Sequence, residues 1–139
     1  MEIADVFGNL PFLETERLVL RKVTLSDAED LFEYASDPEV SRYLPWRPHQ
    51  SIEDSRQFLT TIAGAYDRAD LAPWGLQHKE DRKFIGTITF HDWSIPDARA
   101  EIGYALSRSY WGKGLMTEAG LAVVTFGFTV MELNRIQAR

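Results

Sequence analysis

The sequence predicts an α/β fold in which helices flank a twisted, mixed but mostly antiparallel sheet. Four segments have the composition or the alternation of strands: residues 17–23, 74–78, 84–91 and 99–107. Two longer segments, 51–68 and 115–130, have apolar residues at helical spacing or throughout. The chain has 139 residues, of which 45% are hydrophobic, so we expect residues 1–139 to form a single domain with a real core.

The first helix is expected soon after the first strand. Residues 1–16 are predicted to be an arm or loop, and the strand 17–23 follows them. Thr24 or Ser26 can accept hydrogen bonds from the N–H groups of a first helical turn, which predicts a helix start there. The helix should end near Pro38, because the residue before a proline disfavours the α conformation.

The second helix is expected after a short helical turn, 38–44, and a proline-punctuated loop, 45–49. Ser51 and Asp54 predict a capping box at its start, in which each side chain bonds the backbone of the other residue. From there the apolar spacing predicts a helix that runs to about Arg68.

The second half of the chain is predicted to supply most of the sheet. The apolar segments 74–78 and 84–91 flank the charged turn 79–83, which predicts a hairpin. The strand 99–107 follows a second turn, predicted at residues 93–97. The helix 115–130 is apolar on nearly every side and is expected to be well buried. The last six residues alternate polar and apolar side chains, so we expect them to begin a further strand.

A strand, a glycine turn and a helix follow one another between Glu101 and Val130. The first N–H groups of a helix lack intrahelical partners, and the helix dipole adds partial positive charge at the same end. Gly112 and Gly114 allow an anion to approach the main chain closely. Arg108 and Lys113 bracket the turn, so this stretch predicts a phosphate site.

The glycine pattern alone leaves the ligand open. The Walker pattern is absent, and the dinucleotide pattern starts at Gly112 and Gly114 but has Thr117 in place of its third glycine. A nucleotide-binding protein and a plain strand-to-helix turn with two glycines are therefore both compatible with these residues.

Composition excludes several other classes. The net charge of −6 argues against a general nucleic-acid surface. No apolar run approaches the roughly 20 residues of a membrane-spanning helix. Cysteine is absent, which excludes disulfides and thiolate metal sites, and we expect no metal. The acidic N-terminus has no secretory n-region, so a cytoplasmic location is expected.

Residues 100–104 (AEIGY) and 110–119 (YWGKGLMTEA) together resemble the acetyl-CoA signature of the GNAT-type N-acetyltransferases. The resemblance is strongest to the branch that holds the ribosomal-protein N-terminal acetyltransferases, and residues 15–21 (TERLVLR) resemble the opening of the same branch. The broad signature Q/R-x-x-G-x-G/A falls on Trp111, Gly114 and Met116. Trp111 and Met116 depart from it, and backbone N–H groups are expected to bind the pyrophosphate regardless.

The resemblance implies transfer of an acetyl group from acetyl-CoA to a primary amine. A protein N-terminus, a polyamine, an amino sugar and another small amine all remain open as the acceptor. The pantetheine arm would pair with the backbone of Tyr104 and Leu106, and the pyrophosphate would lie on the backbone of residues 111–116. The residues expected to bind acetyl-CoA are Tyr104, Ala105, Leu106, Arg108, Trp111, Gly112, Lys113, Gly114, Leu115, Met116 and Thr117.

Glu101 is the predicted catalytic base. The amine must be neutral to act as a nucleophile, so a base has to remove a proton directly or through water. Glu101 lies on the strand just before the pantetheine positions, although it could instead pair with a neighbouring arginine. His91 and Asp92, at the end of the preceding strand, are weaker candidates.

The resemblance also implies a missing part. The family continues through a full strand, another helix and two more strands, so we expect a C-terminally incomplete fold whose general acid would lie beyond Arg139. Exposure of a sheet edge and of part of Leu121, Val124 and Phe128 would favour self-association, such as a homodimer. The alternative function is a truncated CoA-binding or interaction domain without turnover.

Overall fold

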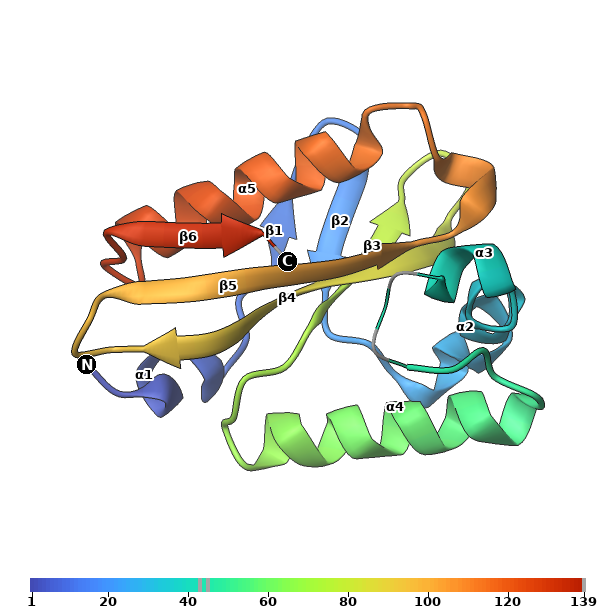
Figure 1. Ribbon diagram of the computed structural model, residues 1–139, viewed down its shortest axis with the longest axis horizontal. Helices are drawn as coiled ribbons and strands as arrows, with labels where there is room; N and C mark the ends of the chain where they lie inside the picture. The colour runs from blue at the N-terminus through green and yellow to red at the C-terminus, as the bar shows by residue number, and fades with distance from the viewer. Residues whose placement is uncertain (43, 45, 139) are drawn as a thin grey trace.

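The described residues of the computed structural model, 1–42, 44 and 46–138, form a six-stranded sheet between two layers of helices (Figure 1). The strands lie side by side in chain order: β1 (Leu13–Glu14), β2 (Leu18–Arg21), β3 (Trp74–His78), β4 (Lys83–Ser94), β5 (Arg99–Leu106) and β6 (Arg135–Ala138). Neighbours from β1 to β5 are antiparallel, whereas β6 is parallel to β5. The predicted mixed, mostly antiparallel sheet is confirmed.

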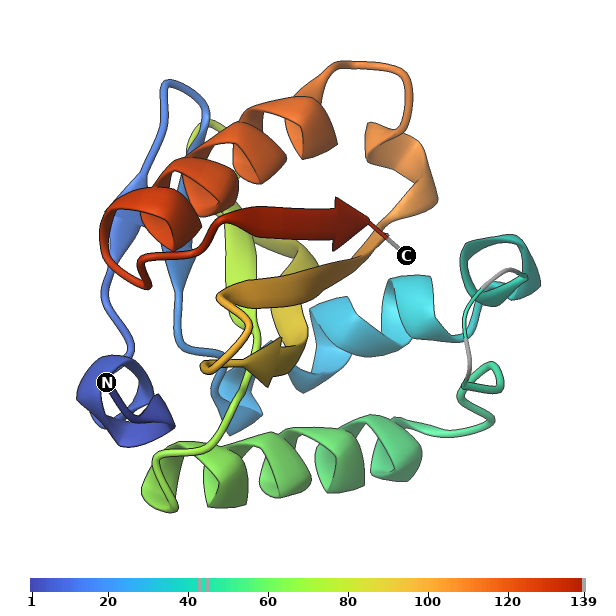
Figure 2. The ribbon, with the colours of Figure 1, turned by 60° about the vertical axis from the view of Figure 1, so that its left-hand side comes forward.

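The helices cover opposite faces of this sheet. One face carries α5 (Leu115–Thr129), and the other carries α2 (Ala28–Ala35), α3 (Pro38–Ser41) and α4 (Ile52–Asp67), as Figure 2 shows. Two 3₁₀ turns, η1 (Leu25–Asp27) and η2 (Arg108–Tyr110), precede α2 and α5. The helix predicted to begin near Thr24 and the helix 51–68 are therefore both confirmed. Among the described residues, no helix is long and apolar enough to cross a membrane, and no cluster of side chains could hold a metal ion.

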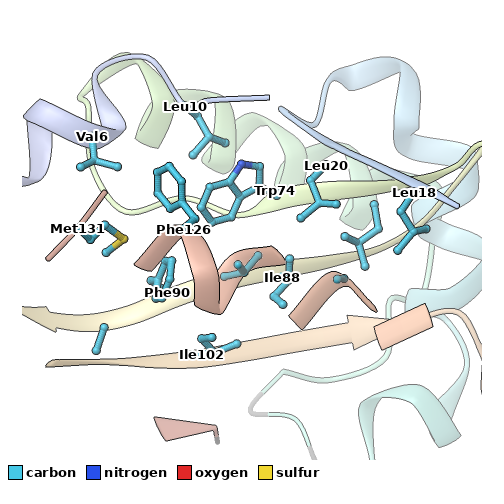
Figure 3. Close-up of a cluster of buried hydrophobic side chains, with 14 of the residues drawn as sticks. Val6, Leu10, Leu18, Leu20, Trp74, Ile88, Phe90, Ile102, Phe126 and Met131 are labelled. Atoms are coloured by element: carbon cyan, nitrogen blue, oxygen red, sulfur yellow. The ribbon is translucent and has the colours of Figure 1, made fainter. Parts of the chain in front are cut away.

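The main hydrophobic core lies between the sheet and α5. Trp74 is fully buried at its centre, and the rings of Phe126 and Phe90 pack edge-on against it with centroids 5.5 Å and 6.0 Å away (Figure 3). A second core lies under α2 and α4, where Tyr34 packs on Phe84 of β4. The sheet is thus anchored on both faces by aromatic residues.

The N-terminal residues are more ordered than predicted. Residues 1–16 were expected to be an arm or loop, but they contain helix α1 (Ile3–Phe7) and strand β1. Phe7 is buried and packs against Trp74 and Trp93. The prediction failed because a five-residue helix and a two-residue strand are too short to show a hydrophobic period.

The two predicted helix starts differ in outcome. Thr24 caps η1, and its N–H donates to the Asp27 carboxylate at 2.9 Å. The capping box at Ser51 is wrong: Asp54 accepts instead from the N–H of Gln50 at 2.8 Å, and in the described chain the Ser51 side chain makes no capping hydrogen bond. The carboxylate reaches one residue further back than the motif predicts.

The prediction that α5 is buried on nearly every side is right only for its inner face. Ala119 and Val123 are fully buried, whereas Leu121 is 68% and Phe128 46% exposed and Val124 is half-buried. The helix rests on the sheet with one face, and its apolar composition therefore extends onto the surface.

The last predicted strand is confirmed as β6, which pairs with the first half of β5. The turn predicted at residues 93–97 is shorter, because β4 continues to Ser94. Three predictions extend outside the described residues: Tyr43 belongs to the predicted turn 38–44, Pro45 to the loop 45–49, and Arg139 to the last strand.

Candidate active site

Among the described residues, the outer backbone edge of β5 is open over its second half. Strand β6 pairs with β5 from Arg99 to Ile102, and beyond that point β5 continues past the tip of β6 with β4 as its neighbour in the described chain (Figure 1). The N–H of Ser107 donates to the Ile85 carbonyl of β4 at 2.7 Å. Backbone groups alternate between the two edges of a strand, so those of Tyr104 and Leu106 are directed away from β4. These are the two positions predicted to pair with a pantetheine arm.

A cavity of about 510 Å³ lies where this open edge meets the glycine turn, the start of α5 and α3. That volume is in the range typical of small-molecule sites. Its walls are Glu39, Val40, Leu44, Tyr104, Ala105, Leu106, Tyr110, Trp111, Gly112, Gly114, Leu115, Met116 and Thr117. The structure thus brings together all the residues predicted to bind acetyl-CoA except Arg108 and Lys113.

The turn depends on its glycines for backbone conformation. Gly112 and Gly114 have φ of +74° and +76°, in the left-handed region that other residues avoid. Around Gly112, a Cβ would meet none of the described atoms within 4 Å, so conformation and not space requires glycine there. Gly114 is the N-cap of α5 and has no side chain to cap it, which leaves the N–H groups of the first turn for a ligand.

The two predicted phosphate-assisting cations have other partners. Arg108 lies 3.7 Å from the Asp37 carboxylate, and the Lys113 ammonium lies over the ring of Tyr110. Tyr110 itself is anchored, because its hydroxyl donates to Asp81 at 2.5 Å. Burial and the Asp81 carboxylate raise the pKa of Tyr110 to about 12, so it stays protonated at neutral pH.

Trp111 closes one end of the open edge. Its indole N–H donates to the carbonyl of Leu106 at 2.8 Å, although the side chain is 45% exposed. This bond ties the turn back to the last residue of β5. It also confirms that the Leu106 carbonyl faces away from β4.

A second cavity of about 360 Å³ continues from the first along β5. Tyr104, Met116 and Thr117 border both cavities. Its other walls come from β4, β5, α5 and β6. The two cavities therefore offer a long ligand anchored at the glycine turn a path along the open edge to the last described pair of β5 and β6, Ile102 with Ala138.

Glu101 lies further along the same strand, outside the wall of the larger cavity. Its neighbours Ala100 and Ile102 are buried in the main core, so the Glu101 side chain lies on the other face of the sheet. It stands opposite His91, whose ring also covers Gly103. The structure thus makes neighbours of two of the three predicted base candidates, while their role stays a prediction.

The sequence reasoning missed two residues next to the turn, Arg17 and Glu118. Arg17 Nε donates to the Glu118 carboxylate at 2.8 Å, and Arg17 Nη1 donates to the carbonyl of Lys113 at 2.9 Å. Both residues lie in the segments that carried the family resemblance, TERLVLR and YWGKGLMTEA. No periodicity connects residues 101 positions apart, so that shared resemblance was the one available signal.

Comparison with known proteins identifies the family. The profile of the acetyltransferase (GNAT) domain matches residues 17–139. The chain belongs to this family. It is 38% identical over 128 residues to the uncharacterized N-acetyltransferase YoaA of Bacillus subtilis, a match that covers 92% of this chain and 72% of that protein. This GNAT chain is therefore an N-acetyltransferase, and acetyl-CoA is its acetyl donor.

Two further relatives support the fold and the branch. The crystal structure of a GNAT-family acetyltransferase from Bacillus anthracis is 32% identical, superposes with a TM-score of 0.78, and is matched over 92% of this chain and 72% of that one. The predicted acyl-CoA N-acyltransferase type of fold is thereby confirmed. The [ribosomal protein uS5]-alanine N-acetyltransferase of Escherichia coli is 29% identical over 91% of this chain and 68% of its own.

Proposed function

We propose that residues 1–139 act as one N-acetyltransferase domain, in which acetyl-CoA occupies the two joined cavities. The observation that carries this proposal is that the open edge of β5 and the uncapped start of α5 border the same cavity. Backbone N–H groups of residues 111–116 hold the pyrophosphate. The backbone of Tyr104 and Leu106 pairs with the pantetheine arm, which directs the thioester toward the last described pair of β5 and β6.

The acceptor is a primary amine. In the reaction the amine nitrogen bonds to the acetyl carbonyl carbon and the carbon–sulfur bond breaks. The amine proton leaves to a base, and the released sulfur takes up a proton.

Glu101 is the proposed base, and it acts through water. Its side chain lies on the face of the sheet opposite to the smaller cavity, whose walls include Ile102 and residues of α5, so proton transfer from an amine in that cavity runs through water. Backbone N–H groups at the separating strands are the proposed donors to the carbonyl oxygen as negative charge develops on it.

A protein N-terminus is the acceptor we favour. The support is the similarity to the uS5-alanine N-acetyltransferase of Escherichia coli, a protein named for such an acceptor. Screening N-terminal peptides, polyamines and amino sugars for thiol release tests this choice. Turnover with a polyamine or an amino sugar but with no peptide would overturn it.

The binding site is tested by placing a carboxylate in the turn. Gly114→Glu should abolish acetyl-CoA binding in isothermal titration, because the side chain puts negative charge where phosphate lies. Gly114→Ala controls for backbone strain at positive φ, and Gly64→Glu adds the same side chain to α4. Unchanged affinity in Gly114→Glu would refute the site, and tighter binding of NAD than of acetyl-CoA would favour a nucleotide-binding protein.

Glu101→Gln tests the base. Turnover should fall by roughly 100-fold or more while acetyl-CoA affinity is retained. If turnover and its pH profile survive, Glu101 is structural. Binding of acetyl-CoA without turnover in the unmodified chain would instead favour the second candidate function, a CoA-binding or interaction domain.

Self-association and a cytoplasmic location stay predictions. The exposed side chains of Leu121 and Phe128 on α5 support self-association, since apolar surface favours protein contacts. Sedimentation velocity tests it, and a monomer at all accessible concentrations would contradict it.

A further inference from the structure

Arg17 connects three separate segments around the glycine turn. Its backbone N–H and its Nε donate to the carboxylate of Glu118 at 2.9 Å and 2.8 Å, and its Nη1 donates to the Lys113 carbonyl at 2.9 Å. The Thr15 hydroxyl donates to the same carboxylate at 2.5 Å. The residue that precedes β2 is therefore fixed to the first turn of α5 and to the turn itself.

Glu118 provides a charged anchor for the guanidinium. Burial by itself would raise the pKa of Glu118, but the hydrogen bonds from Thr15 and Arg17 outweigh it and lower that pKa below its ordinary value. Glu118 is thus ionised at neutral pH, and its bonds to the guanidinium are charge-assisted. This fixes the direction from which Nη1 reaches the turn.

The bond to Lys113 sets the orientation of one peptide group. In a trans peptide the carbonyl and the following N–H point in opposite directions. Because the Lys113 carbonyl points at Arg17, the N–H of Gly114 points away from Arg17. Gly114 lines the larger cavity, and its Cβ position is 3.6 Å from Arg17 Nη2. A glycine beside this peptide makes the reverse orientation accessible, which would turn the carbonyl oxygen toward a bound phosphate.

We propose that Arg17 is a positioning residue for the pyrophosphate subsite: it holds the Lys113–Gly114 peptide with its N–H toward the phosphate and its carbonyl away. The inference rests on the proposed function. Arg17 lies outside the acetyl-CoA signature, and the proposal is that it sets the orientation of a backbone N–H, that of Gly114, within the signature.

The first test compares ligands with and without phosphates. Arg17→Ala should weaken acetyl-CoA binding by roughly 10- to 100-fold, as loss of a charged hydrogen bond does, and should leave S-acetylpantetheine binding unchanged. Binding of both ligands is followed by NMR titration. Equal losses for the two ligands would overturn the proposal, since they would indicate a general structural effect.

Arg21→Ala is the matched control. Arg21 lies on the strand that Arg17 precedes, and it also pairs with a carboxylate, that of Asp27 at 2.9 Å. Arg21→Ala removes the same charge as Arg17→Ala and also breaks one ion pair, but at a place away from the glycine turn. Acetyl-CoA affinity should change less than about 3-fold, and a loss as large as that of Arg17→Ala would show that net charge explains both.

A second pair of variants separates orientation from charge and remains informative if Arg17→Ala folds poorly. Glu118→Gln should weaken acetyl-CoA in the same direction but less, and Arg17→Lys/Glu118→Gln should lose less than the sum of its single variants. The amide resonance of Gly114 should shift on addition of acetyl-CoA in the unmodified protein and not in these variants. Wild-type affinity in the double variant would overturn the proposal, because neither the guanidinium nor its carboxylate anchor would then be needed.

The outcomes distinguish this inference from the function on which it rests. If Gly114→Glu binds acetyl-CoA normally, the proposed site is wrong. If Gly114→Glu loses binding while Arg17→Ala retains it, the site stands and the role of Arg17 is refuted.

Discussion

The two halves of β5 differ in the partners of their outer backbone edge. From Arg99 to Ile102 the strand lies between β4 and β6, and the inward side chain of Ile102 is 6% exposed. From Gly103 to Leu106 its outer edge borders a cavity, and Tyr104 is 46% exposed. One continuous strand therefore stabilises the GNAT fold with its first half and leaves backbone groups for a ligand in its second.

The difference follows the extent of the pairing between β5 and β6 among the described residues. The last described pair joins Ile102 to Ala138, and the next residue of β5 is a glycine. In the described chain no strand pairs with the outer backbone groups beyond that point, and since a buried donor without a partner is costly, we expect water or ligand to meet them. The comparison predicts that substitutions in the first half change stability, whereas substitutions in the second change binding.

Ile102→Ala should give the largest loss of stability. Ile102 is buried in the main core beneath α5, and removing such a side chain leaves a cavity. The free energy of unfolding should fall by about 2–5 kcal/mol, measured by urea denaturation.

Tyr104→Ala is the control for this prediction, because Tyr104 lies two residues further on the same face. Its exposed side chain predicts a change of about 0.5 kcal/mol, together with weaker acetyl-CoA binding. Equal losses of stability in the two variants would remove the distinction between the halves.

Gly103→Ala tests the boundary between the halves. A Cβ at this position would overlap Nε2 of His91 and lie 2.7 Å from its Cδ2. Overpacking of this kind should destabilise the fold by about 1–3 kcal/mol. His91→Ala/Gly103→Ala should recover most of that loss in a double-mutant cycle, since the overlap is with a side chain. Additive effects would show that another contact requires the glycine.

The second half of β5 was the more predictable one. Residues 104–106 and 111–117 are close in sequence, and a strand, a turn and a helix in succession are enough to place an anion site. The conformations of Gly112 and Gly114 follow from the same local pattern. Local chemistry therefore predicted the anion site at the glycine turn, whereas the resemblance to the acetyl-CoA signature supplied Tyr104 and Leu106.

Contacts between distant segments were not predictable in this way. The bond from Arg17 to Glu118 joins residues 101 positions apart, and the position of His91 over Gly103 depends on strand register. Arg108 and Lys113 were placed near the phosphates by sequence proximity, whereas in the structure Asp37 and Tyr110 hold their side chains. Periodicity shows which face of an element is buried, but not which partner it meets.

The pH dependence of stability should distinguish the ion pair that fixes the glycine turn from the apolar packing that stabilises the core. The folded-state pKa of Glu118 is lowered, so its contribution is fully present above the unfolded-state value of about 4.3 and is lost as pH falls through the folded-state value. Glu118→Gln should therefore reduce the loss of stability on acidification below about pH 4.3, measured by thermal unfolding. Ile102→Ala should leave that slope unchanged, and an identical slope in Glu118→Gln and the unmodified protein would contradict the prediction.

Trp111→Phe should have the smallest effect, because it removes one neutral hydrogen bond and keeps an aromatic ring. The indole N–H binds the Leu106 carbonyl at 2.8 Å, and the side chain is 45% exposed, so little apolar burial is lost. Neutral hydrogen bonds are weaker than the charge-assisted ones of Glu118, and a loss of stability of about 1 kcal/mol or less is expected in urea denaturation. Acetyl-CoA affinity should fall by roughly 3- to 10-fold, since that bond orders the carbonyl at the end of the open edge. A stability loss as large as that of Ile102→Ala, with unchanged affinity, would mean that the end of β5 supports the fold and not the ligand.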